Sequence, residues 1–208
     1  MEIGSLSAFV VAALVVLVLP GPGVLYVVAR SVRQGRKAGL VSAAGLSLGV
    51  FTHVLAAALG LSAILLTSAT AFGAVKTAGA AYLVYLGVRA ILSRDVASVS
   101  ESEARRSLRR LFLDGVLVSA LNPKIALFFL AFLPQFVDPG RGSVTLQVVV
   151  LGTLYALLAL MTDGTYALVA GQSRKLLAPT EKPRVWPRYA EGLTYIGLGV
   201  RTAFAERS

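Results

Sequence analysis

The sequence predicts an all-α membrane protein with six transmembrane helices, arranged as two inverted three-helix repeats in which helices one and four are broken. Three observations support this fold class. Of 208 residues, 56% are hydrophobic and only 14% are charged, and the mean hydropathy is +0.77, so the apolar surplus exceeds what one soluble core can bury. Apolar segments of span length recur along the chain, and basic residues gather in alternate connections between them.

Each apolar segment is near or above the roughly 20 residues that a helix needs to cross a bilayer. The segments lie at 6–29, 39–67, 71–92, 112–135, 145–171 and 189–205. The last one spans only if Glu191 and Arg201, at its ends, reach the interfaces. We therefore expect a single transporter domain over residues 1–208, with a first repeat at 1–92, a cytoplasmic linker at 93–111 and a second repeat at 112–208.

The basic residues that give the net charge of +10 are concentrated in a few connections between the apolar segments. Most of the 20 Lys and Arg residues lie at 30–37, 89–110 and 174–188, whereas the connections at 68–70 and 136–144 contain only Arg141. Short loops rich in Lys and Arg stay on the cytoplasmic side. This pattern predicts a multi-pass protein of the bacterial cytoplasmic membrane with both termini outside. We expect its basic residues to set the topology and to contact lipid headgroups, and we expect no nucleic-acid partner.

Composition also narrows the chemistry. The chain has no cysteine and one histidine, so it lacks thiolate ligands and any HExxH-like spacing, and a membrane-embedded enzyme or a cofactor is not expected. A membrane protein of this kind could also export a metal ion or another small solute, and we keep this as an alternative function. Soft metals fit less well, because the chain has no thiolate ligands for them.

Two apolar segments carry a proline break at corresponding places. The breaks are found in "PGPGVLYVVA", at Pro22, and in "LNPKIALFFL", at Pro123. Proline is favoured at the first position of a helix, so each can start a half-helix whose free amides attract anions. Matched breaks in inverted halves indicate a transport site near the midplane; the alternative is that both are kinks satisfied by neighbouring helices.

Ionisable residues inside apolar segments extend this hypothesis. Lys124 follows the second break and should face water, a partner or a ligand. Asp163 could receive a substrate ammonium, carry a coupling proton or pair with Lys124. His53 follows Gly45 and Gly49 at four-residue steps, which suits helix packing within the bundle or across a homodimer, with proton relay as the alternative role.

The chain resembles the LysE/RhtB family of amino-acid exporters. The resemblance rests on "PGPGVLYVVARSVRQGRKAGLVSAAGLSLG", "AGAAYLVYLGVRAIL", "FLDGVLVSALNPKIALFFLAFLPQFV" and "YIGLGVRTAF". It implies a six-span inner-membrane carrier that expels amino acids such as lysine, arginine, threonine, homoserine or leucine by proton antiport. The family's motif residues fall on Pro20, Gly21, Pro22, Asn122, Pro123 and Lys124, and an amino acid would place its carboxylate there.

Overall fold

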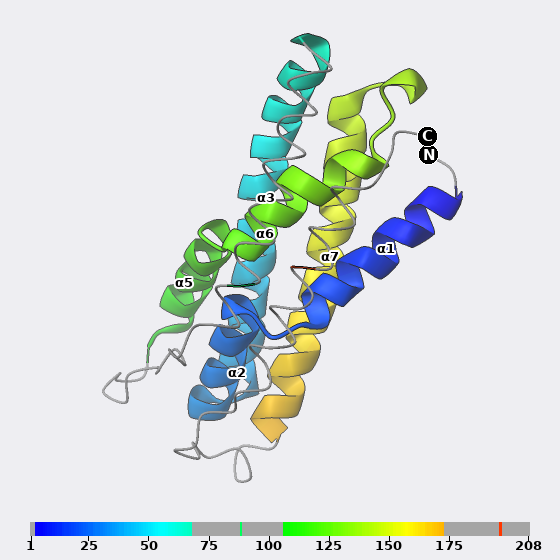
Figure 1. The fold of residues 1–208 in the computed structure, drawn as a ribbon. Helices are drawn as coiled ribbons and strands as arrows, with labels where there is room; N and C mark the ends of the chain where they lie inside the picture. Colours follow the sequence, from blue (N-terminus) through cyan, green and yellow to red (C-terminus); the bar gives the residue numbers. More distant parts are fainter. Residues whose placement is uncertain (1–2, 68–87, 89–105, 173–195, 197–208) are drawn as a thin grey trace.

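The computed structural model describes residues 3–67, 88, 106–172 and 196, and its regular elements in these ranges are helices (Figure 1). The spans predicted at 71–92 and 189–205 lie outside the described residues except for single positions. Within the described part, two helices are long and apolar enough to cross a membrane, and two bent helix pairs pass the same test together. If each bent pair is counted as one span, the described part contains four of the six predicted spans.

The first bent pair consists of α1 (Ile3–Val18) and α2 (Pro22–Gln34), whose axes differ by 54°. Pro22 is the first residue of α2, as its preference for helix starts predicts. Gly35 ends α2 with a φ of +89°, a conformation that glycine adopts without strain.

The predicted loop at 30–37 is therefore nearly absent. Arg30 and Arg33 belong to the last turns of α2, and α3 begins at Arg36 directly after Gly35. The helix thus continues about one turn beyond the apolar segment predicted at 6–29, and a single glycine is enough to turn the chain.

The second bent pair consists of α5 (Leu108–Ala120) and the helical segment Pro123–Phe136, whose axes differ by 43°. This segment begins with α6 (Pro123–Leu127). Pro123 is the first residue of α6. The Ser107 side chain accepts a hydrogen bond from the Arg110 N–H, so α5 starts at Leu108 and includes the last residues of the predicted linker. Beyond α6 the chain continues as a π-helix (Phe128–Phe132), η1, and a 3-10 helix (Leu133–Phe136), η2.

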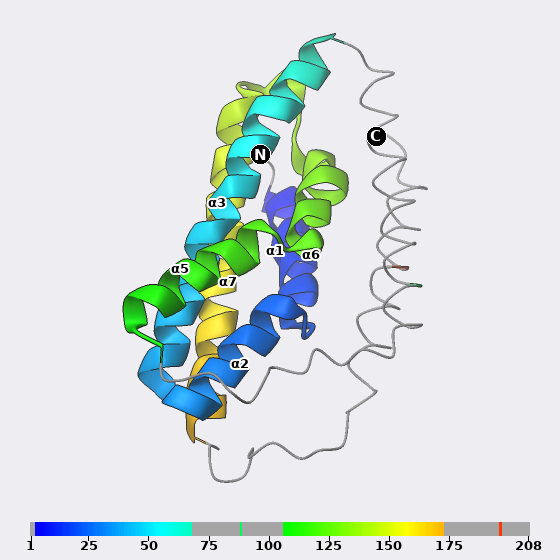
Figure 2. The same ribbon diagram turned by 90° about the vertical axis from the view of Figure 1, so that its left-hand side faces the viewer.

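The two continuous helices are α3 (Arg36–Thr67) and α7 (Val144–Gln172), which pack against each other along the centre of the molecule (Figures 1 and 2). A short 3-10 turn, η3 (Pro139–Arg141), precedes α7. α3 also packs closely against α5 and α2. The two bent pairs run in opposite directions along the bundle, α1 and α2 downward and α5 and α6 upward in Figure 1.

Close packing of α3 on α5 uses the glycines that the sequence singled out. A Cβ added to Gly49 would lie 2.5 Å from the Val116 carbonyl oxygen, and one added to Gly45 would collide with the Phe112 carbonyl. These contacts are between backbones, so neither side can yield. The Gly45–Gly49 face therefore packs within the chain, and not across a homodimer.

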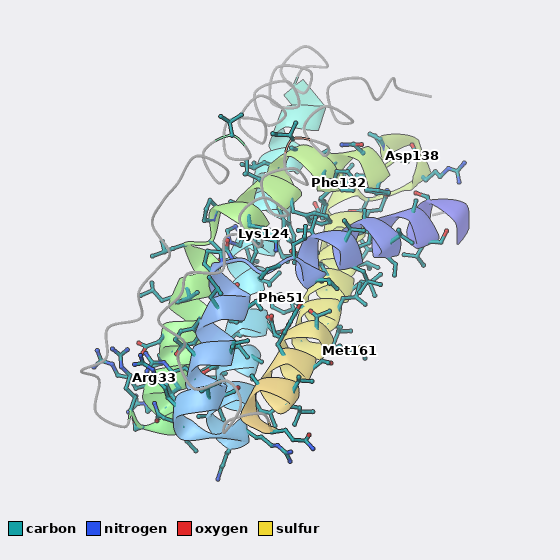
Figure 3. All side chains as sticks on the ribbon, turned by 60° about the horizontal axis from the view of Figure 1, so that its bottom comes forward. Arg33, Phe51, Lys124, Phe132, Asp138 and Met161 are labelled. Atoms are coloured by element: carbon teal, nitrogen blue, oxygen red, sulfur yellow. The ribbon has the colours of Figure 1, made fainter. Side chains whose placement is uncertain are left out.

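The bundle has two ends, which we call the Arg33 end and the Asp138 end. At the Arg33 end, α2 meets α3 and α5 begins, so the basic residues at 30–37 and the described part of the second predicted cluster, 106–110, lie at the same end (Figure 3). At the Asp138 end, η2 and η3 lead into α7 (Figure 3). This separation is what the predicted alternation of charged connections requires.

Candidate functional site

The two helix breaks lie together in space. A Cβ added to Gly23, in the first turn of α2, would lie 3.9 Å from the Asn122 side-chain nitrogen and 3.5 Å from the Leu46 side chain of α3. The predicted half-helix starts are thus present and adjacent. Pro22 and Pro123 are themselves exposed, whereas Gly21, Asn122 and Lys124 are buried. The prolines therefore shape the breaks and do not line the interior between them.

Asn122 organises the second break. Its side-chain Oδ1 accepts a hydrogen bond of 3.0 Å from the Lys124 N–H, and its carbonyl accepts from the N–H groups of Ile125 and Ala126. This is an N-cap, and it explains why asparagine stands directly before the proline. The cap fixes the direction in which the Lys124 side chain leaves the helix.

Lys124 connects the second break to the first. Its side chain is inside the bundle, with 6% of the residue exposed, and its ammonium Nζ donates a 2.6 Å hydrogen bond to the Leu19 carbonyl. Leu19 directly follows α1, where carbonyls lack helical donors and the helix dipole favours a cation. Figure 3 shows Lys124 about midway between Arg33 and Asp138. Of the three surroundings expected for Lys124, namely water, a partner or a ligand, the structure shows a partner, the Leu19 carbonyl.

Asp163 places a negative charge beside this cation. It belongs to α7, only 7% of it is exposed, and it interacts electrostatically with Lys124. The hydrogen bond described for the ammonium runs to Leu19, so the carboxylate acts on Lys124 through space. Two opposite charges are therefore held inside the bundle, where attraction between them is stronger than in water.

Tyr166 is a site residue that sequence reasoning missed. Its hydroxyl donates a 2.6 Å hydrogen bond to the Val18 carbonyl, the neighbour of the carbonyl that Lys124 contacts. Tyr166 lies three residues after Asp163, hence on the same face of α7. Helical spacing from Asp163 was the available signal, but tyrosine in an apolar helix is equally common at a membrane interface.

An aromatic cluster fills the interior between this polar site and the Asp138 end. It comprises Phe9, Phe128, Phe129, Phe132, Phe136 and Tyr155. Phe128, Phe129 and Phe132 come from the π-helix that follows α6; such helices are rare and often occur at functional sites. Because Phe9 joins the cluster from α1, the cluster also links the two bent pairs.

His53 lies close to the second break, because the Ser119 carbonyl that it contacts also accepts a hydrogen bond from the Asn122 N–H. Its Nε2 is 3.0 Å from the Ser119 carbonyl at the end of α5, and its ring centroid is 6.1 Å from that of Phe129. Both contacts extend the Gly45–Gly49 face, as the packing interpretation of His53 predicts. A role in proton relay stays a hypothesis.

A second polar network ties α2 to α5 at the Arg33 end. The Tyr26 hydroxyl donates a 2.9 Å hydrogen bond to the Leu111 carbonyl, and Arg30 lies over the Tyr26 ring at 5.4 Å. Asp114 on α5 forms ion pairs with Arg106 and Arg110. Arg30 is buried and belongs to α2, so it is part of a helix and not of the connection predicted at 30–37.

A bundle of apolar helices with paired breaks and buried ionisable residues is typical of membrane transport proteins. Comparison of the sequence with known protein families identifies the family. Residues 14–205 match the family LysE type translocator, and the chain belongs to this family of membrane translocators.

The relatives are similar over most of their length. The chain is 28% identical to an uncharacterized membrane protein of Bacillus subtilis, covering 97% of this chain and 99% of the relative. It is 32% identical to an uncharacterized membrane protein of Pseudomonas aeruginosa, covering 96% and 95%. It is 30% identical to a homoserine/homoserine lactone efflux protein of Salmonella typhimurium, covering 78% and 79%. No solved structure matches the chain.

Proposed function

We propose that this translocator exports amino acids or close derivatives across the bacterial cytoplasmic membrane in exchange for protons. One observation carries the proposal: Lys124 and Asp163 are both buried within Coulombic range of each other, and Lys124 bridges the two helix breaks. An amino acid has the complementary pair of charges, an ammonium and a carboxylate, on one α-carbon. The name of the Salmonella relative, an efflux protein for an amino acid and its lactone, supports the same substrate class.

The substrate carboxylate would lie between Lys124 and the start of α2. Gly21 provides no side-chain acceptor for the first amides of α2, and such amides at a helix start attract anions. The substrate ammonium would lie near Asp163 and the Val18 and Leu19 carbonyls, the latter two being acceptors at the end of α1. Each substrate charge thus has a partner of opposite polarity.

Binding of a carboxylate would change the contact that joins the breaks. In the present structure the Lys124 ammonium serves the Leu19 carbonyl, and a carboxylate is a stronger acceptor than a neutral carbonyl. Substrate would therefore draw Lys124 away and leave the α1–α2 break free to move. Two inverted halves, 1–92 and 112–208, could then rock about the site and expose it to each side in turn.

Proton exchange is assigned to Asp163. A carboxylate that holds a substrate ammonium on one side of the membrane can accept a proton after the ammonium leaves, since an isolated buried charge is costly. The return step would then carry a neutral acid. No bond of the substrate is made or broken in this cycle.

An efflux assay tests the proposal. Purified protein is reconstituted in liposomes loaded with radiolabelled amino acids, an inward proton gradient is imposed, and release is compared with liposomes carrying Lys124→Met. We expect gradient-driven release of at least one amino acid by the unmodified protein only. Equal release from both preparations, or release of a metal ion in place of every amino acid, would contradict the proposal.

A further inference from the structure

Tyr155, on α7, has a buried hydroxyl that the fold does not use. The residue is 0% exposed, and its hydroxyl has no hydrogen-bond partner within the described part of the chain. The Tyr26 and Tyr166 hydroxyls, in contrast, donate to the Leu111 and Val18 carbonyls. Phenylalanine would fill the same space without burying an unsatisfied polar group. A buried hydroxyl without a protein partner needs a physical explanation, and a ligand that brings a hydrogen-bonding group supplies one.

Tyr155 lies on the same helix as Asp163, eight residues or about 12 Å earlier along its axis. Tyr155, Ala159 and Asp163 follow one another at four-residue steps along the buried stripe of α7, and Asp163 is within electrostatic range of the Tyr155 hydroxyl. The residue between the phenol and the carboxylate is a small alanine. Tyr155 is therefore the next polar group along the stripe on the side of Asp163 away from Tyr166.

Aromatic neighbours hold the phenol in place. The Tyr155 ring centroid is 4.6 Å from that of Phe128 and 5.4 Å from that of Phe129. Both phenylalanines belong to the π-helix that directly follows the helix carrying Lys124. The surroundings of the hydroxyl are thus apolar and ordered, which is the setting in which one hydrogen bond discriminates strongly between ligands.

We propose that Tyr155 is a specificity-determining substrate contact, whose hydroxyl hydrogen-bonds to a polar group on the side chain of the exported amino acid. The inference rests on the proposed function, in which Lys124 and Asp163 take the α-carboxylate and α-ammonium. The side chain of the substrate then faces the aromatic residues around Tyr155, among which the Tyr155 hydroxyl is the polar group. The favoured substrates are neutral amino acids whose short side chains carry a hydroxyl or a similar hydrogen-bonding group.

Pairs of substrates with equal shape test this assignment. Threonine and valine differ by a hydroxyl in place of a methyl group, and homoserine and norvaline differ in the same way. In proteoliposomes, the unmodified protein should export the hydroxylated member of at least one pair about tenfold faster. Tyr155→Phe should bring the hydroxylated member down to the rate of its partner.

Tyr26→Phe is the matched control, because it removes a phenol at the Arg33 end and should preserve the preference. A second readout is thermal stability: Tyr155→Phe should melt no lower than the unmodified protein, since it removes a hydroxyl without a protein partner. A preference that survives Tyr155→Phe, equal rates in the unmodified protein, or a lowered melting temperature would overturn the inference. Release of no amino acid at all would overturn the proposed function, and this inference with it.

Discussion

The break between α1 and α2 and the break between α5 and α6 look alike in sequence but are stabilised differently. Both place a proline at the first position of the following helix. The second break is capped locally, by the Asn122 side chain on the Lys124 N–H. The first has Gly21 as its N-cap, with no side-chain cap, and its Val18 and Leu19 carbonyls accept hydrogen bonds from Tyr166 and Lys124.

This difference indicates that the first break depends on residues that lie at and beyond the second, whereas the cap of the second does not depend on the first. The second break is held by its own residues, whereas the first is held by side chains of α6 and α7. A ligand that occupies Lys124 therefore acts on the first break without disturbing the cap of the second. Substitutions in α6 and α7 should accordingly have their effect on the geometry of α1 and α2.

The largest effect is expected from Lys124→Met, which keeps most of the stem and removes the charge. The substrate carboxylate and the Leu19 carbonyl both lose their partner, so export of every amino acid tested should fall about ten- to a hundredfold. Lys124→Arg should be a partial defect, because a planar guanidinium does not replace a compact ammonium. Initial efflux rates are compared at equal amounts of inserted protein.

Lys37→Met is the control for this prediction, since Lys37 is exposed at the start of α3 and should leave export near normal. Full export by well-inserted Lys124→Met would show that the two breaks are not coupled through this residue.

Asp163→Asn should reduce export about tenfold, because the amide keeps the shape of the carboxylate and loses its attraction for an ammonium. The remaining transport should no longer respond to an imposed proton gradient. Asp138→Asn is the matched control at an exposed position. A variant that still follows the gradient would assign the coupling proton to another group.

Asn122→Ala tests the local cap of the second break. Loss of a side-chain cap typically costs about 0.5–2 kcal/mol, and here it also loosens the position of Lys124, so both stability and export should fall. Ser107→Ala removes a cap of the same kind from α5 at the Arg33 end. It should lower the melting temperature to a similar extent with a much smaller effect on export; equal export defects would mean that the Asn122 cap acts through stability alone.

Tyr166→Phe should have the smallest effect. It removes one hydrogen bond to the first break, worth about 1 kcal/mol, while Lys124 still serves the adjacent carbonyl. Export should fall less than fivefold, with a small decrease in melting temperature. A defect as large as that of Lys124→Met would shift the main support of the first break from Lys124 to Tyr166.

The features that sequence reasoning identified are those in which residue type dictates local geometry. Pro22 and Pro123 start helices because their φ is already helical and the missing N–H costs nothing there. A lysine within an apolar segment must turn inward, as Lys124 does. Gly45 and Gly49 mark close helix packing because any side chain would separate the backbones.

The features that it missed depend on tertiary contacts. Nothing in the sequence indicates that the Lys124 ammonium meets a carbonyl 105 residues away, because backbone acceptors are the same at every position. Arg30 looks like the other basic residues near a membrane surface, yet helix α2 carries it inward. The π-helix at Phe128–Phe132 likewise arises from packing of the aromatic cluster and has no sequence signature.

The most direct test of the coupling role of Lys124 is export by the double variant Lys124→Met, Asp163→Asn in proteoliposomes. If Lys124 holds the substrate carboxylate and the first break, removal of both charges leaves the substrate without either partner, and the double variant should export no faster than Lys124→Met alone. If Lys124 serves only to neutralise Asp163, removing both charges together relieves the unpaired charge. Efflux restored to near the unmodified rate would contradict the account.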